Sequence, residues 1–186
     1  MALALVLASG MALAVNEIGT NSADTLRGTG GADNLLGRGG NEVRPQGGDK
    51  NLLGGPGNDA VLGGNGSDNP LGGSGNDDVS GGRGADSVLG GGGPDWHVDG
   101  PLSDTARDAL SGGDGNDAFI VNNLPATRDI ITCGGLDRVA ADSKDQAASD
   151  CERVRRGRDA ELELAGMFEE LGFFAVFEGL APSPFD

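Results

Sequence analysis

The chain has 186 residues, of which 36 are glycine and 4% are aromatic, and its 29 acidic against 13 Lys and Arg side chains give a formal net charge of -16. So few large apolar side chains cannot fill a conventional globular core of this size, and an ordinary enzyme fold is not expected. The glycine content falls short of one residue in three, which excludes collagen. The acidity disfavours nucleic acid and anionic lipid as partners and favours cations. A disordered acidic linker and a repeat fold remain.

The first residues form an uncharged apolar run, MALALVLASGMALA, which is too short to span a bilayer. The run ends in the small-residue site Ala12-Leu13-Ala14, and no positive charge precedes it. We predict that residues 1–14 are a secretory signal cleaved after Ala14, and that the protein is secreted. The alternative is an apolar strand or helix that packs onto the end of the fold.

The middle of the chain falls into blocks of nine residues that share the pattern GGxGxD. Five consecutive blocks read GGPGNDAVL, GGNGSDNPL, GGSGNDDVS, GGRGADSVL and GGGGPDWHV over residues 54–98, and GGDGNDAFI follows at 112–120. Degenerate copies occupy 19–45 and 103–111. Residues 46–53 are a copy one residue short, and 99–102 are an insertion. A period this regular argues against a disordered linker and for a solenoid.

The pattern GGxGxDxUx, where U is a large apolar residue, resembles the RTX, or hemolysin-type, repeat of calcium-binding bacterial exoproteins. The stretch from Cys133-Gly134-Gly135 to Asp150-Cys151-Glu152 is similar to the ending of small secreted proteins made of such repeats. The resemblance covers residues 19–154 and implies an all-β fold, a right-handed parallel β-roll, with calcium ions between stacked turns. The terminal segments, 1–14 and 155–186, would lie outside the roll.

The residues of each block agree with that fold. Glycine at positions 1, 2 and 4 permits a tight turn, and Asp at position 6 closes it. Positions 7 to 9 form a short strand in which only position 8 points inward. Two blocks make one full coil, so alternate turns stack about 4.8 Å apart. The predicted apolar spine consists of Leu26, Leu35, Val61, Val79, Val88, Leu110 and Phe119.

Stacking of this kind piles up aspartates that repel one another unless a cation neutralises them. Calcium fits because it accepts six or more hard oxygen ligands from carboxylates and backbone carbonyls. The family's arrangement pairs turn 54–59 with 72–77, 63–68 with 81–86, and 72–77 with 90–95, which predicts about three good sites. Asp24, Asp33 and Asp108 are weaker candidates. The predicted metal-site residues are Gly54, Pro56, Asp59, Gly63, Asn65, Asp68, Gly72, Ser74, Asp77, Gly81, Arg83, Asp86, Gly90, Gly92, Asp95 and Asp117.

The two cysteines, Cys133 and Cys151, are separated by the length of one coil, that is, by two regular blocks. They would therefore lie one above the other at about one strand spacing, within reach of a disulfide. Two free thiols are the alternative. A zinc site is not expected, because the chain lacks a CxxC pair and has one histidine.

Several residues break the pattern. Glu42 and Arg44 occupy positions 6 and 8 of the block at 37–45, which is expected to lose its ion and its strand. Pro70, at an inward position, removes a hydrogen-bond donor from the ladder. We expect His97 to tilt toward solvent beside the insertion, with a minor possibility of a catalytic or ligand role, and Trp96 to cover that irregular end.

The last thirty residues are Phe-rich, and 159–171 have the spacing of a short amphipathic helix, which predicts a helical or irregular cap. No catalytic motif is present, and we predict a non-enzymatic calcium-binding protein that folds on binding the ion. A two-carboxylate carbohydrate-active enzyme is the weakest alternative and would use Asp99 and Asp104. A calcium-dependent adhesion or scaffold module is the other, and the Leu-rich ninth column would serve a partner or form a second wall of the spine.

Overall fold

The computed structural model describes residues 14–20, 25–38, 42–43, 47–101, 103–121, 123 and 126–156. All regular secondary structure in these residues is β-strand, and every strand pairs in parallel with its neighbours. The cap predicted at the C-terminus, including the helix at 159–171, lies outside the described residues apart from 155–156, and so does the signal segment apart from Ala14.

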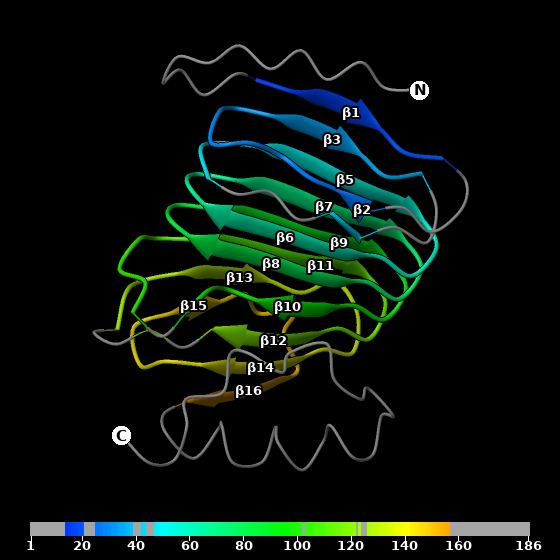
Figure 1. The fold of residues 1–186 in the computed structure, drawn as a ribbon. Coiled ribbons are helices and arrows are strands. Elements are labelled where there is room, and N and C mark those ends of the chain that lie inside the picture. The colour runs from blue at the N-terminus through cyan, green and yellow to red at the C-terminus, as the bar shows by residue number, and fades with distance from the viewer. Residues whose placement is uncertain are drawn as a thin grey trace, which may run out of the picture.

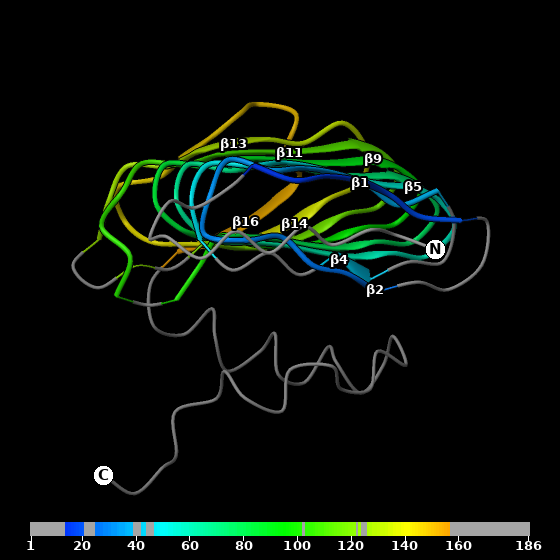
Figure 2. The same cartoon turned by 45° about the horizontal axis from the view of Figure 1, so that its top comes forward.

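The chain alternates between two parallel sheets, so that successive strands lie in opposite sheets (Figure 1). Viewed from another angle, the two sheets form two layers joined by turns at both edges (Figure 2). The odd-numbered sheet contains β1 (Asn16–Ile18), β3 (Asn34–Leu36), β5 (Asn51–Pro56), β7 (Asn69–Ser74), β9 (Ser87–Gly92), β11 (Ala109–Asp114), β13 (Ile130–Thr132) and β15 (Gln146–Ala147). The even-numbered sheet contains β2 (Thr25–Leu26), β4 (Glu42–Val43), β6 (Ala60–Asn65), β8 (Asp78–Arg83), β10 (Trp96–Val98), β12 (Ala118–Val121), β14 (Arg138–Ala141) and β16 (Arg153–Arg156). This is the predicted β-roll.

Strand register confirms the coil of two nine-residue blocks. Ala60 pairs with Asp78, which occupies the same position two blocks further along the chain. Asn34 pairs with Asn51, one position short of two full blocks, because the block at 46–53 lacks a residue. Ser87 pairs with Ala109 across a longer stretch of chain, because the extra residues between β10 and β11 leave the strands aligned. The strands therefore remain stacked in register, and the differences in block length are confined to the turns.

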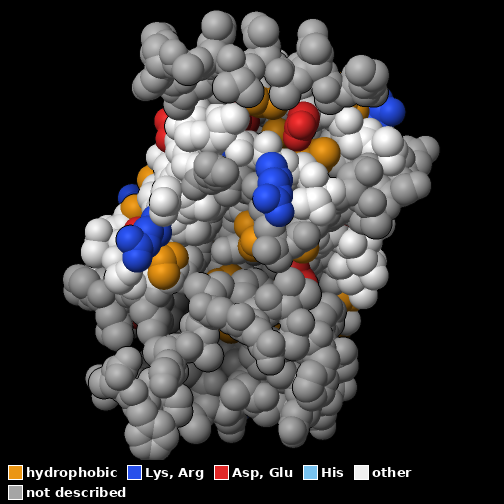
Figure 3. All heavy atoms as spheres, in the orientation of Figure 1, with side chains coloured by type: hydrophobic (Ala, Val, Ile, Leu, Met, Phe, Trp, Pro, Cys, Tyr) orange, Lys and Arg blue, Asp and Glu red, His pale blue; other side chains and the backbone are white. Residues whose placement is uncertain are grey.

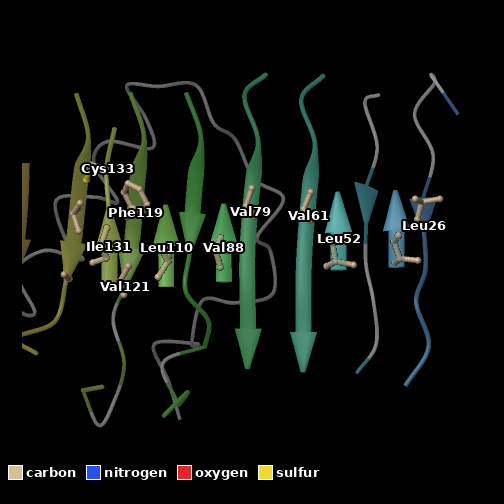
Figure 4. Close-up of a cluster of buried hydrophobic side chains, with 13 residues drawn as sticks. Leu26, Leu52, Val61, Val79, Val88, Leu110, Phe119, Val121, Ile131 and Cys133 are labelled. Atoms are coloured by element: carbon tan, nitrogen blue, oxygen red, sulfur yellow. The ribbon is translucent and has the colours of Figure 1, made fainter. Parts of the chain in front are cut away.

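The core is a single file of side chains between the two sheets (Figure 4). All seven predicted spine residues are buried in it. The structure adds residues that the nonapeptide phase did not include, because the blocks around them are irregular: Leu52, Val121, Ile131, Cys133, Val139 and Ala141. A core this narrow stabilises the roll only modestly, since each coil contributes about two apolar side chains.

The predicted loss of the strand at 37–45 is wrong. The two-residue strand β4 remains, with Val43 paired to Leu26 on one side and to Val61 on the other. Val43 therefore occupies position 8 of this block, one residue earlier in the chain than the sequence predicted. Strand pairing on both sides determines this register. Pro70 has the predicted effect, since the pairing of β7 with β9 begins only at Leu71.

The prediction that His97 tilts toward solvent is also wrong. Its side chain is fully buried, and its ring stacks on Phe119 with centroids 4.6 Å apart. Burial lowers the pKa of His97 to about 3, so the ring is neutral at physiological pH. Trp96 is 7% exposed and packs against Ala118 and Ala140 on the outer face of its sheet. The strand's alternation thus places His97 inside, beside the spine, and Trp96 outside.

The outer face of the odd-numbered sheet carries two parallel columns of side chains. Asn34 donates to Asn16 at 2.8 Å, Asn51 to Asn34 at 2.9 Å and Asn69 to Asn51 at 3.2 Å. The leucines at the third residue of β3, β5, β7 and β9, which are Leu36, Leu53, Leu71 and Leu89, form the other column, and Leu89 is 42% exposed. Because these leucines alternate with the buried spine residues, they lie outside the core and do not form a second wall of the spine.

The predicted disulfide is confirmed. Cys133 and Cys151 are bonded, with their Cα atoms 5.1 Å apart. Cys133 is buried in the spine cluster, and Cys151 packs against that cluster. The bond links successive coils at the end of the roll, where the strands are short.

Reducing this bond is expected to destabilise the calcium-loaded protein by about 3 kcal/mol, the value for a closed loop of roughly this length. The measurement is the denaturant midpoint with and without dithiothreitol. A variant with Cys133→Ala and Cys151→Ala provides the control, because its midpoint should be low and insensitive to the reductant. Equal midpoints for the reduced and oxidised native chain would contradict the prediction.

Candidate metal centre

The repeated turn requires glycine for two different reasons. At position 1, a Cβ on Gly72 would lie 2.5 Å from Asp77 Oδ2 and 2.8 Å from the carbonyl oxygen of Gly90. At positions 2 and 4, Gly73 and Gly75 have φ angles of 128° and 135°, which side chains rarely allow. The first glycine therefore makes room for the carboxylate, and the others shape the turn around it.

Stacking these turns produces one column of position-6 side chains along each edge of the roll. The turns that lead into the odd-numbered strands contribute Asp33, Lys50, Asp68, Asp86, Asp108, Asp129 and Asp145. The turns that lead into the even-numbered strands contribute Asp59, Asp77, Asp95, Asp117 and Asp137. All of these side chains are buried. Accordingly, red atoms are sparse on the described part of the face in Figure 3.

Each column is ordered by backbone hydrogen bonds. The backbone N–H of Asp59 donates to Asp77 Oδ1 at 2.8 Å, that of Asp77 to Asp95 at 2.9 Å, and that of Asp95 to Asp117 at 2.9 Å. The Oδ2 atoms of Asp77, Asp95 and Asp117 are buried and have no hydrogen-bond partner. One oxygen of each carboxylate thus accepts a hydrogen bond from the backbone, and the other is available to a cation.

Burial is the main cause of the unusual acid–base behaviour of these aspartates. Burial, together with repulsion from neighbouring carboxylates, raises the pKa of Asp77 to about 6 and those of Asp86 and Asp95 to about 7, against a smaller lowering by backbone hydrogen bonds. The ionised columns are therefore unfavourable in the absence of a cation. The donors are hard oxygens, carboxylates together with turn carbonyls, and this is the set that calcium prefers.

The predicted turn pairs are brought together, since the turns of 54–59, 72–77 and 90–95 stack along one edge. The position-3 carbonyls of Ser74, Arg83 and Gly92 also accept hydrogen bonds of 2.8 Å from the preceding coil. Of the weaker candidates, Asp33 and Asp108 join the odd-numbered edge, whereas Asp24 lies outside the described residues.

Sequence reasoning missed three members of the columns, Asp129, Asp137 and Asp145, because their turns lack the GGxGxD pattern. Asp129 and Asp137 keep the other half of the repeat, an apolar residue two positions after the aspartate. Those apolar residues, Ile131 and Val139, belong to the spine. The spacing between aspartate and spine could have identified both of them without the glycines.

Lys50 replaces aspartate in its column. Its side chain is 1% exposed, and its ammonium lies 3.0 Å from the carbonyl oxygen of Gly31, 2.9 Å from that of Gly48 and 3.6 Å from Asp33 Oδ2, with Gly47 O as a further acceptor. Burial opposes ionisation of Asp33, but hydrogen bonds from Thr29 and Val15 and the Lys50 charge hold the pKa of Asp33 below its usual value. The protein thus supplies its own cation among the oxygens of two stacked turns.

The fold and its carboxylate columns define a parallel β-roll with hard-cation sites. Residues 18–43, 47–70 and 71–96 match the family model of the RTX calcium-binding nonapeptide repeat in four copies. These residues are similar to that family, whose repeats bind calcium. No curated protein and no solved structure matches the chain. None of the described residues forms a helix long and apolar enough to cross a membrane.

The raised pKa values predict that, in the absence of calcium, the folded roll is more stable at acidic pH than at neutral pH. A carboxyl whose pKa is higher in the folded state than in the unfolded chain contributes stability below its unfolded pKa, and this contribution is lost as the pH rises through the folded value. For Asp77, Asp86 and Asp95 that window runs from the ordinary value of 3.8 to about 6 or 7. Circular dichroism in chelator should therefore show more β-structure at pH 4.5 than at pH 7.5. The opposite order would contradict the prediction.

Proposed function

We propose that the chain is a secreted, non-enzymatic calcium-binding protein whose β-roll folds when calcium binds between stacked turns. The observation that carries this proposal is the row of buried carboxylates with one unpartnered oxygen each, as in Asp77, Asp95 and Asp117. Calcium would neutralise these oxygens and would join turns that otherwise repel each other. Affinity is expected in the range of extracellular modules, about 0.1 to 1 mM.

Secretion is supported by the apolar segment at 1–14 and by the disulfide, which forms and persists in oxidising compartments. In this proposal, the predicted roll of 19–154 extends to 16–156, because β1 and β16 pair with its sheets, and the rest of 155–186 follows it as a cap or tail. The candidates for a carbohydrate-active enzyme do not favour catalysis, because Asp99 and Asp104 are only 1% and 6% exposed.

The ligand assignment is tested with Asp77→Asn. Asp77 belongs to two of the predicted turn pairs, so its loss is expected to raise the calcium concentration at half-folding by about tenfold, the equivalent of 1.4 kcal/mol. Calcium titrations followed by circular dichroism measure this midpoint. Asp114→Asn is the matched control, because Asp114 is exposed and occupies position 3, where other blocks have Pro, Asn, Ser, Arg or Gly. Equal midpoints for the two variants would contradict the assignment.

A regular outer surface favours a second candidate function, a calcium-dependent adhesion or scaffold module. The asparagine column and the leucine column form this surface on the odd-numbered sheet, and it exists only while the coils are stacked. Calcium would then control the surface through folding. This function would be added to calcium binding and would not replace it.

A further inference from the structure

The insertion after β10 creates a cluster that the repeat pattern does not contain. Val98 pairs with Ser80, and the backbone N–H of Gly82 donates to Asp99 O at 2.9 Å. Asp99 therefore occupies in its own coil the position that Gly81 has in the preceding coil. A Cβ at Gly81 would lie 2.6 Å from Asp86 Oδ2, which shows where a side chain at position 1 points. The extra residues between β10 and β11 lengthen this turn, and the carboxylate of Asp99 can therefore fit beside that of Asp108.

Three carboxylates meet at this point. One oxygen each from Asp99, Asp108 and Asp129 lies within 4.8 Å of the others, and the three side chains are at most 1% exposed. Arg107 and Arg128, which precede Asp108 and Asp129 in the chain, are not buried with them. Carboxylates this close and this buried repel strongly unless a positive charge lies between them.

A neutral side chain supplies an independent indication of a ligand. Asn123 is 2% exposed and donates through Nδ2 to Asp99 Oδ2 at 2.8 Å, while its Oδ1 has no partner. Asp99 Oδ1 and Asp108 Oδ2 accept no hydrogen bond from a nitrogen or hydroxyl donor, and the two carboxyl groups lie close enough to share a proton, whereas Asp129 accepts hydrogen bonds from Asp108 N at 2.8 Å and Thr127 Oγ1 at 3.1 Å. The unpartnered oxygens therefore come from three different side chains at one buried place.

A shared proton would not complete this cluster. One proton would leave two negative charges, and the amide oxygen of Asn123 would still lack a donor. A divalent cation would reduce the charge and would accept the amide and carboxylate oxygens together. Magnesium fits poorly, because it keeps several waters, whereas calcium accepts irregular cages of protein oxygens.

We propose that Asp99, Asp108, Asp129 and Asn123 form a further calcium site, in which a carboxylate replaces the first glycine of the repeat. The site lies beyond residues 18–96, where the family model matches, and it would hold the irregular coils around β11 and β13 to the regular part of the roll. The inference rests on the proposed function only in taking the same ion. Three carboxylates in a closed site favour tighter binding than the regular turns provide.

The test counts calcium ions bound to the full chain by native mass spectrometry and isothermal titration. Asp99→Gly restores the residue that the regular turn has, and Asn123→Ala removes a neutral ligand without changing the charge. We expect Asp99→Gly to lose one tight site and to keep there at most an ion held with the affinity of the regular turns, and Asn123→Ala to weaken one tight site by about tenfold. Asp114→Asn, the exposed control, should bind the native number.

The outcomes separate this inference from the proposed function. If the native chain binds no calcium, the proposed function fails and the inference fails with it. If the native chain binds calcium and both variants bind it identically, the further site is refuted and the regular sites stand. If Asp99→Gly does not fold, the titration of Asn123→Ala decides, and an unchanged tight site overturns the inference.

Discussion

Removing calcium at pH 7.5 is expected to convert the roll into a largely unfolded chain. The spine contributes only about two apolar side chains per coil, and the ionised columns oppose stacking, so chain entropy exceeds the remaining stabilisation. Circular dichroism in chelator should lose its β signal. The radius of gyration should rise from about 16 Å toward about 46 Å, the values for a compact and an unfolded chain of this length.

Adding calcium back should restore both signals, whereas magnesium at the same concentration should not, because magnesium sheds its water reluctantly. A β signal that persists unchanged in chelator would refute coupled folding. It would then favour a permanently folded scaffold. The disulfide should remain intact in both states, so reoxidation does not limit refolding in this experiment.

Replacing Lys50 is expected to have the second largest effect. Lys50→Met removes a buried ammonium from three carbonyl oxygens and from Asp33, a change that typically costs about 3 to 5 kcal/mol. Because Lys50 is part of the chain, this loss should not depend on calcium concentration. Chemical denaturation at several calcium concentrations measures it.

Lys50→Asp restores the residue that the other turns have at position 6, and it sharpens the test. This variant should be unstable at low calcium and should regain stability as calcium rises, with one more ion bound than in the native chain. Lys144→Met is the control, since Lys144 is exposed and its ammonium donates to Ala126 O at 2.6 Å. If Lys50→Met and Lys144→Met have equal stability, the structural role of the ammonium is disproved.

Much of the metal centre could be predicted because the repeat couples position to role. The aspartate at position 6 and the apolar residue at position 8 are two residues apart, so a phase read from glycines also identified Asp77 and Val79. The same logic failed for Asp129, where the glycines are missing, and for Asp137, whose shortened turn keeps Gly134 and Gly135 outside the GGxGxD pattern; strand pairing maintains the register at both. It also failed for Lys50, because the repeat pattern assigns a carboxylate to position 6 and gives no sign that an ammonium can occupy the same place.

Local pattern by itself determined the parallel roll, the coil of two blocks and the spine, and it placed the two cysteines one coil apart, because a nine-residue period assigns each residue type one place in the coil. Only the tertiary structure decided what happens where the period breaks. Neighbouring strands pair on both sides of β4 and β10, and this pairing imposes the register on irregular blocks. For that reason His97 lies inside the spine, Asp99 lies beside Asp108, and Lys50 lies among the oxygens of two turns.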